Sequence, residues 1–255
     1  MQTVAASNTQ DLYDQHTNLW VRSSPTILSD YTARPRVLQR IGDVRGLSVL
    51  DLGCGEGYVA RELARAGAER IVGMDLSSKM VQAAQEQNKE DLYPISYSVE
   101  DLRQWSEPKS EYDRAVAVFL FNYLNVQDSI EVLTKTHRAL RSGAELILTL
   151  PHPSLPWLRP QQAPFYFNRP GVSYFDARDH ELAGRIWQRN GDSVPVQCFH
   201  KTMEDIFKMI TKSGFQLIGF EELYVTSEHI ELDHAFFSPL RGTPLHVLVH
   251  AKVEK

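Results

Sequence analysis

From residue 46 to residue 151 the chain alternates short apolar runs with longer segments of helical periodicity. This alternation is typical of βαβ units, which build a parallel sheet covered by helices. The predicted strands are 47–52, 70–76, 94–99, 112–121 and 144–150. The predicted helices between them are 58–67, 77–90 and 126–143, of which the first and last end at glycine. The pattern restricts the fold to the α/β class.

After residue 150 the pattern changes. Residues 151–198 are rich in proline and aromatic residues, and a structureless loop of that length is improbable in a compact domain. We expect an insertion with a hairpin over 184–199 that turns at Asn190 and Gly191. A helix at 200–214 and strands at 215–225 and 244–253 follow, which makes seven strands in the main sheet. Residues 1–45 precede the sheet and are expected to be helical.

A glycine-rich loop follows the first strand, in the sequence VLDLGCGEGYVARELA of residues 49–64. Such a turn brings the backbone close to a ligand and places the start of a helix behind it. The dinucleotide pattern G-x-G-x-x-G is not met, because Tyr58 holds the third position and the glycine is Gly57. The P-loop lysine is also absent.

The loop reads D-x-G-x-G-x-G, which resembles the first motif of class I S-adenosylmethionine-dependent methyltransferases of the small-molecule type. The resemblance covers residues 46–151 well and 201–253 loosely. It implies a Rossmann-like, doubly wound, seven-stranded sheet that is mostly parallel with an antiparallel last strand. On this reading 1–45 form an N-terminal helical cap, 46–255 form the methyltransferase domain, and 151–198 are a substrate-covering insertion after strand 5.

The resemblance implies S-adenosylmethionine as cofactor and assigns its parts to this chain. Asp51 would hold the amino-acid end, and Asp75, which ends the second strand, would accept both ribose hydroxyls. The acidic residue usual beside the adenine falls on Ser98, so residues 100–102 take that role. The predicted cofactor-binding residues are Tyr13, Asp51, Gly53, Cys54, Gly55, Gly57, Tyr58, Asp75, Leu76, Met80, Glu100, Asp101, Leu102 and Phe119.

Methyl transfer from a sulfonium depends chiefly on alignment in a water-poor site, and a general base is needed only if the acceptor must lose a proton. His152 follows the fifth strand directly and is the first candidate for such a base; His200 is the second. Alternatively, His152 satisfies a turn in the segment PHP and His200 lies beside a helix cap. The predicted substrate residues are Trp20, Asn122, Tyr123, Tyr174 and Trp187.

Aromatic side chains dominate small-ligand pockets, so the aromatic insertion suggests an apolar or planar acceptor. Core packing would account for about half of these aromatics equally well. Tyr13 and Trp20 either fold over the cofactor or only pack the first helix on the sheet. Cys54 is interpreted as a small residue that fits the turn rather than as a nucleophile.

Composition excludes several other partners. A net charge of −5 and the absence of a Lys/Arg block argue against nucleic acid, and no apolar run approaches the ~20 residues of a membrane span. Two cysteines and the lack of a signal segment favour a reducing cytoplasm. His229, Glu231, Asp233 and His234 contain no tight ligand motif, so no metal is predicted. Nothing in the sequence indicates the oligomeric state.

Three other readings remain. A nicotinamide dehydrogenase shares the sheet and the ribose-binding acid, but Tyr58 stands where its third glycine belongs. A nucleic-acid methyltransferase would show an N-P-P-Y type motif where FNYL stands at residues 121–124. A methyltransferase-like protein that catalyses another reaction, such as a cyclisation, or that only scaffolds a partner, stays open.

Overall fold

The computed structural model describes residues 9–21, 24–169 and 171–254; residues 1–8 and 22–23 of the predicted helical cap lie outside the described part. The main sheet contains β1 (Ser48–Leu52), β2 (Arg70–Asp75), β3 (Ile95–Val99), β4 (Tyr112–Val118), β5 (Leu140–Pro151), β9 (Phe215–Leu223) and β10 (His246–Val253). A second sheet contains β6 (Phe165–Phe167), β7 (Glu181–Trp187) and β8 (Ser193–Phe199).

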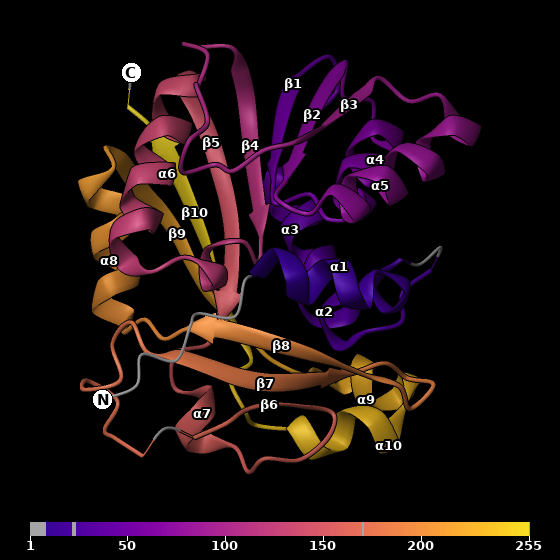
Figure 1. Ribbon diagram of the computed structural model, residues 1–255, viewed down its shortest axis with the longest axis vertical. Helices are drawn as coiled ribbons and strands as arrows, with labels where there is room; N and C mark the ends of the chain where they lie inside the picture. Colours follow the sequence, from indigo (N-terminus) through magenta and orange to yellow (C-terminus); the bar gives the residue numbers. More distant parts are fainter. Residues whose placement is uncertain (1–8, 22–23, 170, 255) are drawn as a thin grey trace.

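The helices precede, connect and follow these strands (Figure 1). They are α1 (Thr9–Trp20), α2 (Leu28–Thr32), α3 (Arg34–Ile41), α4 (Tyr58–Arg65), α5 (Ser78–Asp91), α6 (Val126–Ala139), α7 (Leu155–Leu158), α8 (Met203–Lys212), α9 (Ser227–Leu232) and α10 (His234–Phe237), with 3-10 turns at Phe121–Tyr123 and Ser238–Leu240. None of the helices in the described ranges is long and apolar enough to cross a membrane.

The strand order of the main sheet is β3-β2-β1-β4-β5-β10-β9. Strands β1 to β5 pair in parallel, whereas β10 runs antiparallel to both of its neighbours, β5 and β9. The order reverses between β1 and β4, and ligands of doubly wound sheets bind beyond the carboxyl ends of the strands at such a switch point. The predicted fold class is confirmed.

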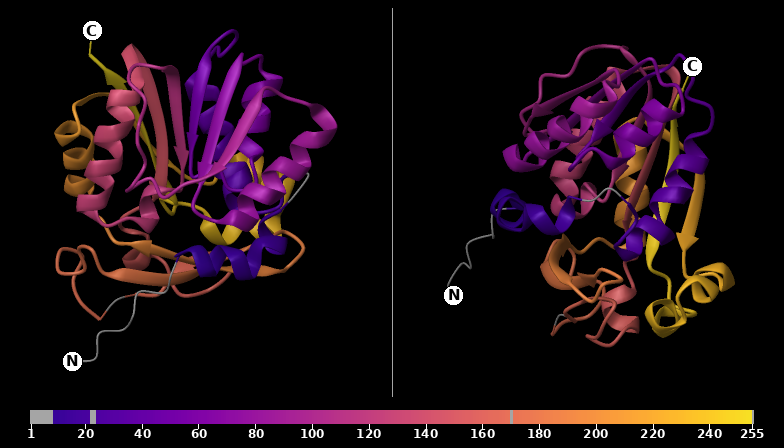
Figure 2. Two further views of the ribbon diagram at one scale, coloured as in Figure 1. Left: turned by 45° about the horizontal axis from the view of Figure 1, so that its top comes forward. Right: turned by 90° about the vertical axis from the view of Figure 1, so that its right-hand side faces the viewer.

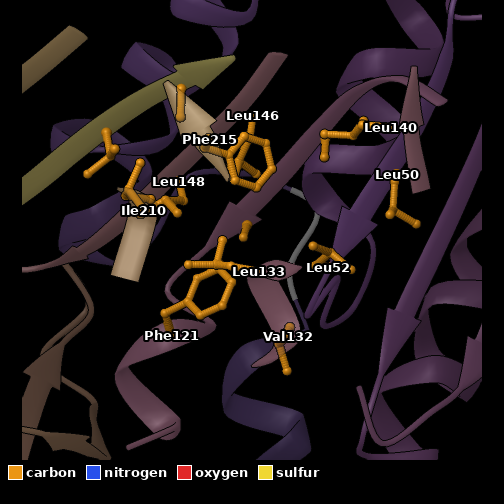
Figure 3. Close-up of a cluster of buried hydrophobic side chains, with 14 of the residues drawn as sticks. Leu50, Leu52, Phe121, Val132, Leu133, Leu140, Leu146, Leu148, Ile210 and Phe215 are labelled. Carbon is orange, nitrogen blue, oxygen red and sulfur yellow. The ribbon is translucent and has the colours of Figure 1, made fainter. Parts of the chain in front are cut away.

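Alternate residues of the central strands pack on opposite faces of the sheet, as the two-residue period of a strand requires. Leu146 and Leu148 of β5 join the cluster beneath α6 and α8, together with Phe121 (Figure 3). Ile147, between them, joins the cluster beneath α3 and α4. The apolar run of β5 is therefore explained by a strand that is covered on both sides.

The predicted boundaries of β4, α6 and β5 are wrong. Strand β4 ends at Val118 and not at residue 121, because Phe119 turns the chain with φ +61° into a 3-10 turn. Helix α6 ends at Ala139 and not at Gly143, because Leu140 already pairs with Tyr112 of β4. Gly143 lies inside β5, so it does not terminate the helix.

The insertion folds into the small antiparallel sheet β6-β7-β8. The expected hairpin is present as β7 and β8, and Gly191 occupies its turn with φ +96°. Figures 1 and 2 show this sheet facing the carboxyl ends of the parallel strands, with α1 between the two. The glycine loop, α1 and the small sheet line one cavity there.

Candidate active site

A cavity of about 520 Å³ opens at the carboxyl edge of the main sheet. One part of its wall comes from the loops after β1, β2, β3 and β4, which carry most of the predicted cofactor residues. Another part comes from α1, the small sheet and β10. Its size and mixed lining are those of a small-molecule site.

The glycine loop is held in place from several sides. The backbone N–H groups of Gly53 and Cys54 donate to the Met74 carbonyl at 2.8 and 3.0 Å, which ties the loop to β2. Glu56 and Arg61 form a buried ion pair at 2.6 Å behind the loop. The loop is therefore preorganised rather than shaped by a ligand.

Gly55 and Gly57 both adopt left-handed backbone, at φ +56° and +82°, but differ in what a Cβ would meet. A Cβ on Gly57 would overlap the hydroxyl of Tyr97 and lie 2.8 Å from its Cζ, whereas a Cβ on Gly55 has no protein atom within 4 Å. Gly55 lines the cavity and Gly57 does not.

We expect Gly55→Ala to cost about 1 kcal/mol of stability through backbone strain and to weaken S-adenosylmethionine about tenfold by intruding on the cavity. Gly57→Ala should cost more stability, because the overlap with Tyr97 adds to the strain. Denaturant unfolding and calorimetry measure the two effects. Equal stability loss in both variants, with equal affinities, would contradict this division of roles.

Asp75 joins the glycine loop to the start of α5. Its carboxylate accepts the N–H of Gly55 at 2.9 Å and the N–H of Ser77 at 2.9 Å, and it lines the cavity. A carboxylate has about four acceptor positions, so it retains capacity for two further donors. Ser77 caps α5 and donates to Asp14 of α1, which brings α1 over this end of the cavity.

Asp51 and Arg34 supply opposite charges to the cavity wall. Asp51 is 1% exposed, and its Oδ2 has no hydrogen-bond partner in the described part of the chain. Burial and, to a smaller extent, the charge of Asp75 raise the pKa of Asp51 to about 7, while Arg34 opposes the rise. Arg34 donates to Ser29 Oγ at 2.6 Å and to Asp30 Oδ1 at 2.8 Å.

The loop after β4 borders both parts of the cavity through Phe119, Asn122 and Tyr123. Tyr123 is hydrogen-bonded to Tyr13 of α1 through their hydroxyls. Lys201 Nζ, which is buried, donates to the carbonyls of Phe121 and Leu124 and so ties this loop to the end of the insertion. The residues between β8 and α8 therefore hold the loop after β4 in place.

Most of the residues singled out from the sequence meet at this cavity. Its lining includes Tyr13, Trp20, Asp51, Gly53, Cys54, Gly55, Tyr58, Asp75, Leu76, Met80, Glu100, Asp101, Leu102, Phe119, Asn122 and Tyr123. Burial holds the pKa of the Cys54 thiol well above its usual value, which disfavours the thiolate form that a nucleophile requires. The Asp101 carboxylate is already engaged by Arg103 at 2.8 Å.

Tyr174, Trp187 and His200, predicted for the acceptor side, do not line this cavity. The Tyr174 hydroxyl accepts the N–H of Met203 at 2.9 Å, and His200 Nε2 donates to the Tyr174 carbonyl at 2.9 Å. Trp187 packs on Tyr166, with ring centroids 5.9 Å apart. These side chains stabilise the insertion and its junction with α8.

His152 also lies outside the cavity lining. Its Nδ1 accepts the N–H of Ser154 at 3.1 Å and its Nε2 donates to Glu222 Oε1 at 2.8 Å. Burial lowers the pKa of His152, while Glu222 opposes the shift. Both nitrogens are occupied, so the structure places His152 as a brace of the turn after β5.

We expect His152→Ala to lower the free energy of unfolding by about 1–2 kcal/mol, because Ser154 N–H and Glu222 lose their partner. Turnover per folded molecule should change little. Denaturant unfolding and a methyl-transfer assay measure the two quantities. A large loss of turnover at unchanged stability would instead indicate that His152 acts directly on the acceptor, as a general base would.

Several cavity residues carry no local motif and were missed. They were not singled out as site residues from the sequence: Ser29, Arg34, Phe165, Phe167, Ile186, Val196 and His246. They come from α2, α3, the small sheet and β10, far apart in the sequence. No group of three or more His, Cys, Asp or Glu suited to a metal occurs within the described ranges.

Comparison with known proteins agrees with this geometry. Residues 49–143 match the family model described as a methyltransferase domain. The chain is similar to a demethylmenaquinone methyltransferase of Lactococcus lactis, at 26% identity over 194 residues that cover 74% of this chain and 73% of that protein.

Solved structures share the fold. An S-adenosylmethionine-dependent methyltransferase from Mesorhizobium loti aligns at TM-score 0.67 and 24% identity, covering 86% of this chain and 96% of that one. Magnesium protoporphyrin IX methyltransferase from Synechocystis, with bound S-adenosylmethionine, aligns at TM-score 0.60 and 17% identity over 99% and 100% of the two chains. Residues 49–143 thus form a methyltransferase domain, with the D-x-G-x-G-x-G loop and Asp75 at one cavity, and the chain shares the fold of S-adenosylmethionine-dependent methyltransferases.

Proposed function

We propose that this enzyme transfers the methyl group of S-adenosylmethionine to a small acceptor with an apolar or planar body. The proposal depends chiefly on one observation: a single cavity is lined both by the predicted cofactor-binding loops and by apolar side chains of the small sheet. The glycine loop and the β2 carboxylate line one part, and Phe165, Phe167 and Ile186 of the small sheet line another.

The cofactor side suits each part of S-adenosylmethionine. Asp75 retains acceptor positions for two ribose hydroxyls, and the buried side chains of Met80 and Leu102 offer apolar surface to the base. The methionyl end carries both an ammonium and a carboxylate. Asp51, with its unpartnered Oδ2, and the Arg34 guanidinium would pair with these two charges.

The cofactor supplies a methyl group already activated by a sulfonium, so this chain needs mainly to orient the acceptor and exclude water. The Tyr13–Tyr123 hydrogen bond holds α1 against the loop after β4. Gln188 Nε2 in the turn between β7 and β8 donates to the Leu19 carbonyl at 2.7 Å and fixes α1 on the other side. α1 thus covers the site.

The apolar acceptor can be tested within one strand. Ile186 is 5% exposed and lines the cavity, whereas its neighbour Trp187 points to the other side of β7 and does not. We expect Ile186→Ala to raise the acceptor KM about tenfold through lost apolar contact. Trp187→Ala, the matched control, should leave KM within about twofold. A larger rise in acceptor KM for Trp187→Ala than for Ile186→Ala would show that the acceptor does not bind against Ile186.

The function itself is tested by incubating the enzyme with methyl-labelled S-adenosylmethionine and, in separate reactions, the organic and the aqueous fraction of a metabolite extract. We expect label in an apolar product and release of S-adenosylhomocysteine in equal amount. Asp75→Ala should abolish both at low cofactor concentration. Tight binding of S-adenosylhomocysteine without any transfer would favour a scaffold, and label confined to polar products would refute the acceptor class.

A further inference from the structure

We propose that His246 recognises the methyl acceptor by accepting a hydrogen bond, through Nδ1, from its hydroxyl or N–H group. This inference rests on the proposed function, whose acceptor it describes more closely. His246 is the first residue of β10, is 1% exposed and lines the cavity.

The proton on the imidazole is located by its contact with Thr32. Thr32 Oγ1 lies 3.0 Å from the Leu28 carbonyl and 3.1 Å from His246 Nε2. A carbonyl only accepts, and a hydroxyl has one proton to donate. Both contacts are hydrogen bonds only if Thr32 donates to Leu28 and His246 Nε2–H donates to Thr32. Nδ1 then carries a lone pair.

No hydrogen-bond donor for that lone pair occurs within the described residues. His246 Nδ1 is buried without a hydrogen-bond partner. The ring packs against Phe119, with centroids 4.9 Å apart, and against Phe165 at 5.8 Å, and neither phenyl ring can donate. Nearby His152 has both nitrogens engaged. Because an unpaired buried acceptor is costly, a donor on a ligand in the cavity is the fitting partner.

The environment also keeps the ring neutral. Burial, together with smaller effects of Arg34 and His152, lowers the pKa of His246 to about 3. The imidazole therefore keeps its single proton on Nε2, accepts a hydrogen bond through Nδ1 to orient the substrate, and does not hold a second proton. Its place beside Phe119, in the loop after β4, puts this contact in the cavity wall between the glycine loop and the small sheet.

The tautomer is tested directly on the full-length protein, without turnover. Long-range ¹H–¹⁵N correlation spectra, with the His246 signals identified by their loss in His246→Phe, should show protonated Nε2 and bare Nδ1 at neutral pH. A proton on Nδ1 would overturn the proposal. Thr32→Val, which removes the acceptor that holds Nε2–H, should increase the Nδ1–H tautomer.

Binding of two probes tests the recognition. 1-Naphthol and 1-methoxynaphthalene share a planar apolar body, but only the first has a donor. With S-adenosylhomocysteine bound, the wild type should prefer 1-naphthol about ten- to a hundredfold, and His246→Phe should lose this preference. His250→Phe, on the same strand and outside the cavity lining, should keep it.

The outcomes separate this inference from the proposed function. Absent binding of S-adenosylhomocysteine to the wild type would refute the function. Suppose that S-adenosylhomocysteine binds. If the wild type then binds neither probe or binds both equally, or if His246→Phe still prefers 1-naphthol, only the role of His246 is refuted. Should His246→Phe fail to fold, Thr32→Val must show a reduced preference for 1-naphthol, and an unchanged one would overturn the proposal.

Discussion

Asp75→Ala is expected to weaken S-adenosylmethionine binding at least about a hundredfold. Each hydrogen bond to a charged acceptor contributes roughly 1.5–3 kcal/mol, and the ribose offers two donors to this carboxylate. The substitution also frees the N–H groups of Gly55 and Ser77, which Asp75 now holds at the loop and at the start of α5. The loss therefore combines missing ligand contacts with a less ordered loop.

Two comparisons isolate the ligand contacts. Asp75→Asn keeps one acceptor oxygen and should lose less affinity than Asp75→Ala. Asp101→Ala alters a second cavity carboxylate that is already paired with Arg103, and it should have a small effect. Calorimetry measures affinity, and unfolding without ligand verifies the fold. If folded Asp75→Ala binds S-adenosylmethionine within threefold of the wild-type affinity, Asp75 does not bind the cofactor.

Cofactor affinity is expected to fall steeply with acid below pH 7. Burial raises the pKa of Asp51 to about 7 in the free protein, so the carboxyl takes up a proton as the pH falls through this value. Pairing with the cofactor's ammonium requires the ionised form, so binding must release that proton. Affinity then falls about tenfold per pH unit, or roughly fiftyfold from pH 7 to pH 5.

The matched variant is Asp51→Asn, which cannot titrate and should bind weakly with a much flatter pH profile. Burial also raises the pKa of Asp75, so any slope that persists in Asp51→Asn belongs to Asp75. Calorimetry with S-adenosylhomocysteine in two buffers of different ionisation enthalpy counts the released proton. A wild-type profile that is flat from pH 5 to pH 7 would exclude Asp51 as the partner of the ammonium.

The two histidines near the end of β5 illustrate where sequence reasoning stops. His152 drew attention because it follows a strand of the sheet, whereas His246 had no motif around it. In the structure His246 pairs with Pro151, the residue before His152. The two are neighbours, yet one braces a turn and the other lines the cavity. The pairing register and the pleat decide this, and neither is visible in an isolated strand.

The sequence by itself determined the α/β fold and brought the cofactor residues to one edge. Asp51 and the glycine loop lie at the carboxyl end of β1, Asp75 ends β2, and the segment 100–102 follows β3. Parallel neighbours place their carboxyl ends at the same edge, so a local pattern is sufficient to assemble this half of the site.

Only the tertiary structure decided the acceptor side. Arg34, Ile186 and His246 lie on a helix, a hairpin and the antiparallel last strand, and more than two hundred residues of chain separate the first from the last. Which face of each element is buried, and against what, depends on how the small sheet docks on α1 and β10. That docking arises from non-directional apolar burial, which fixes no spacing in the sequence, so these residues meet without a motif.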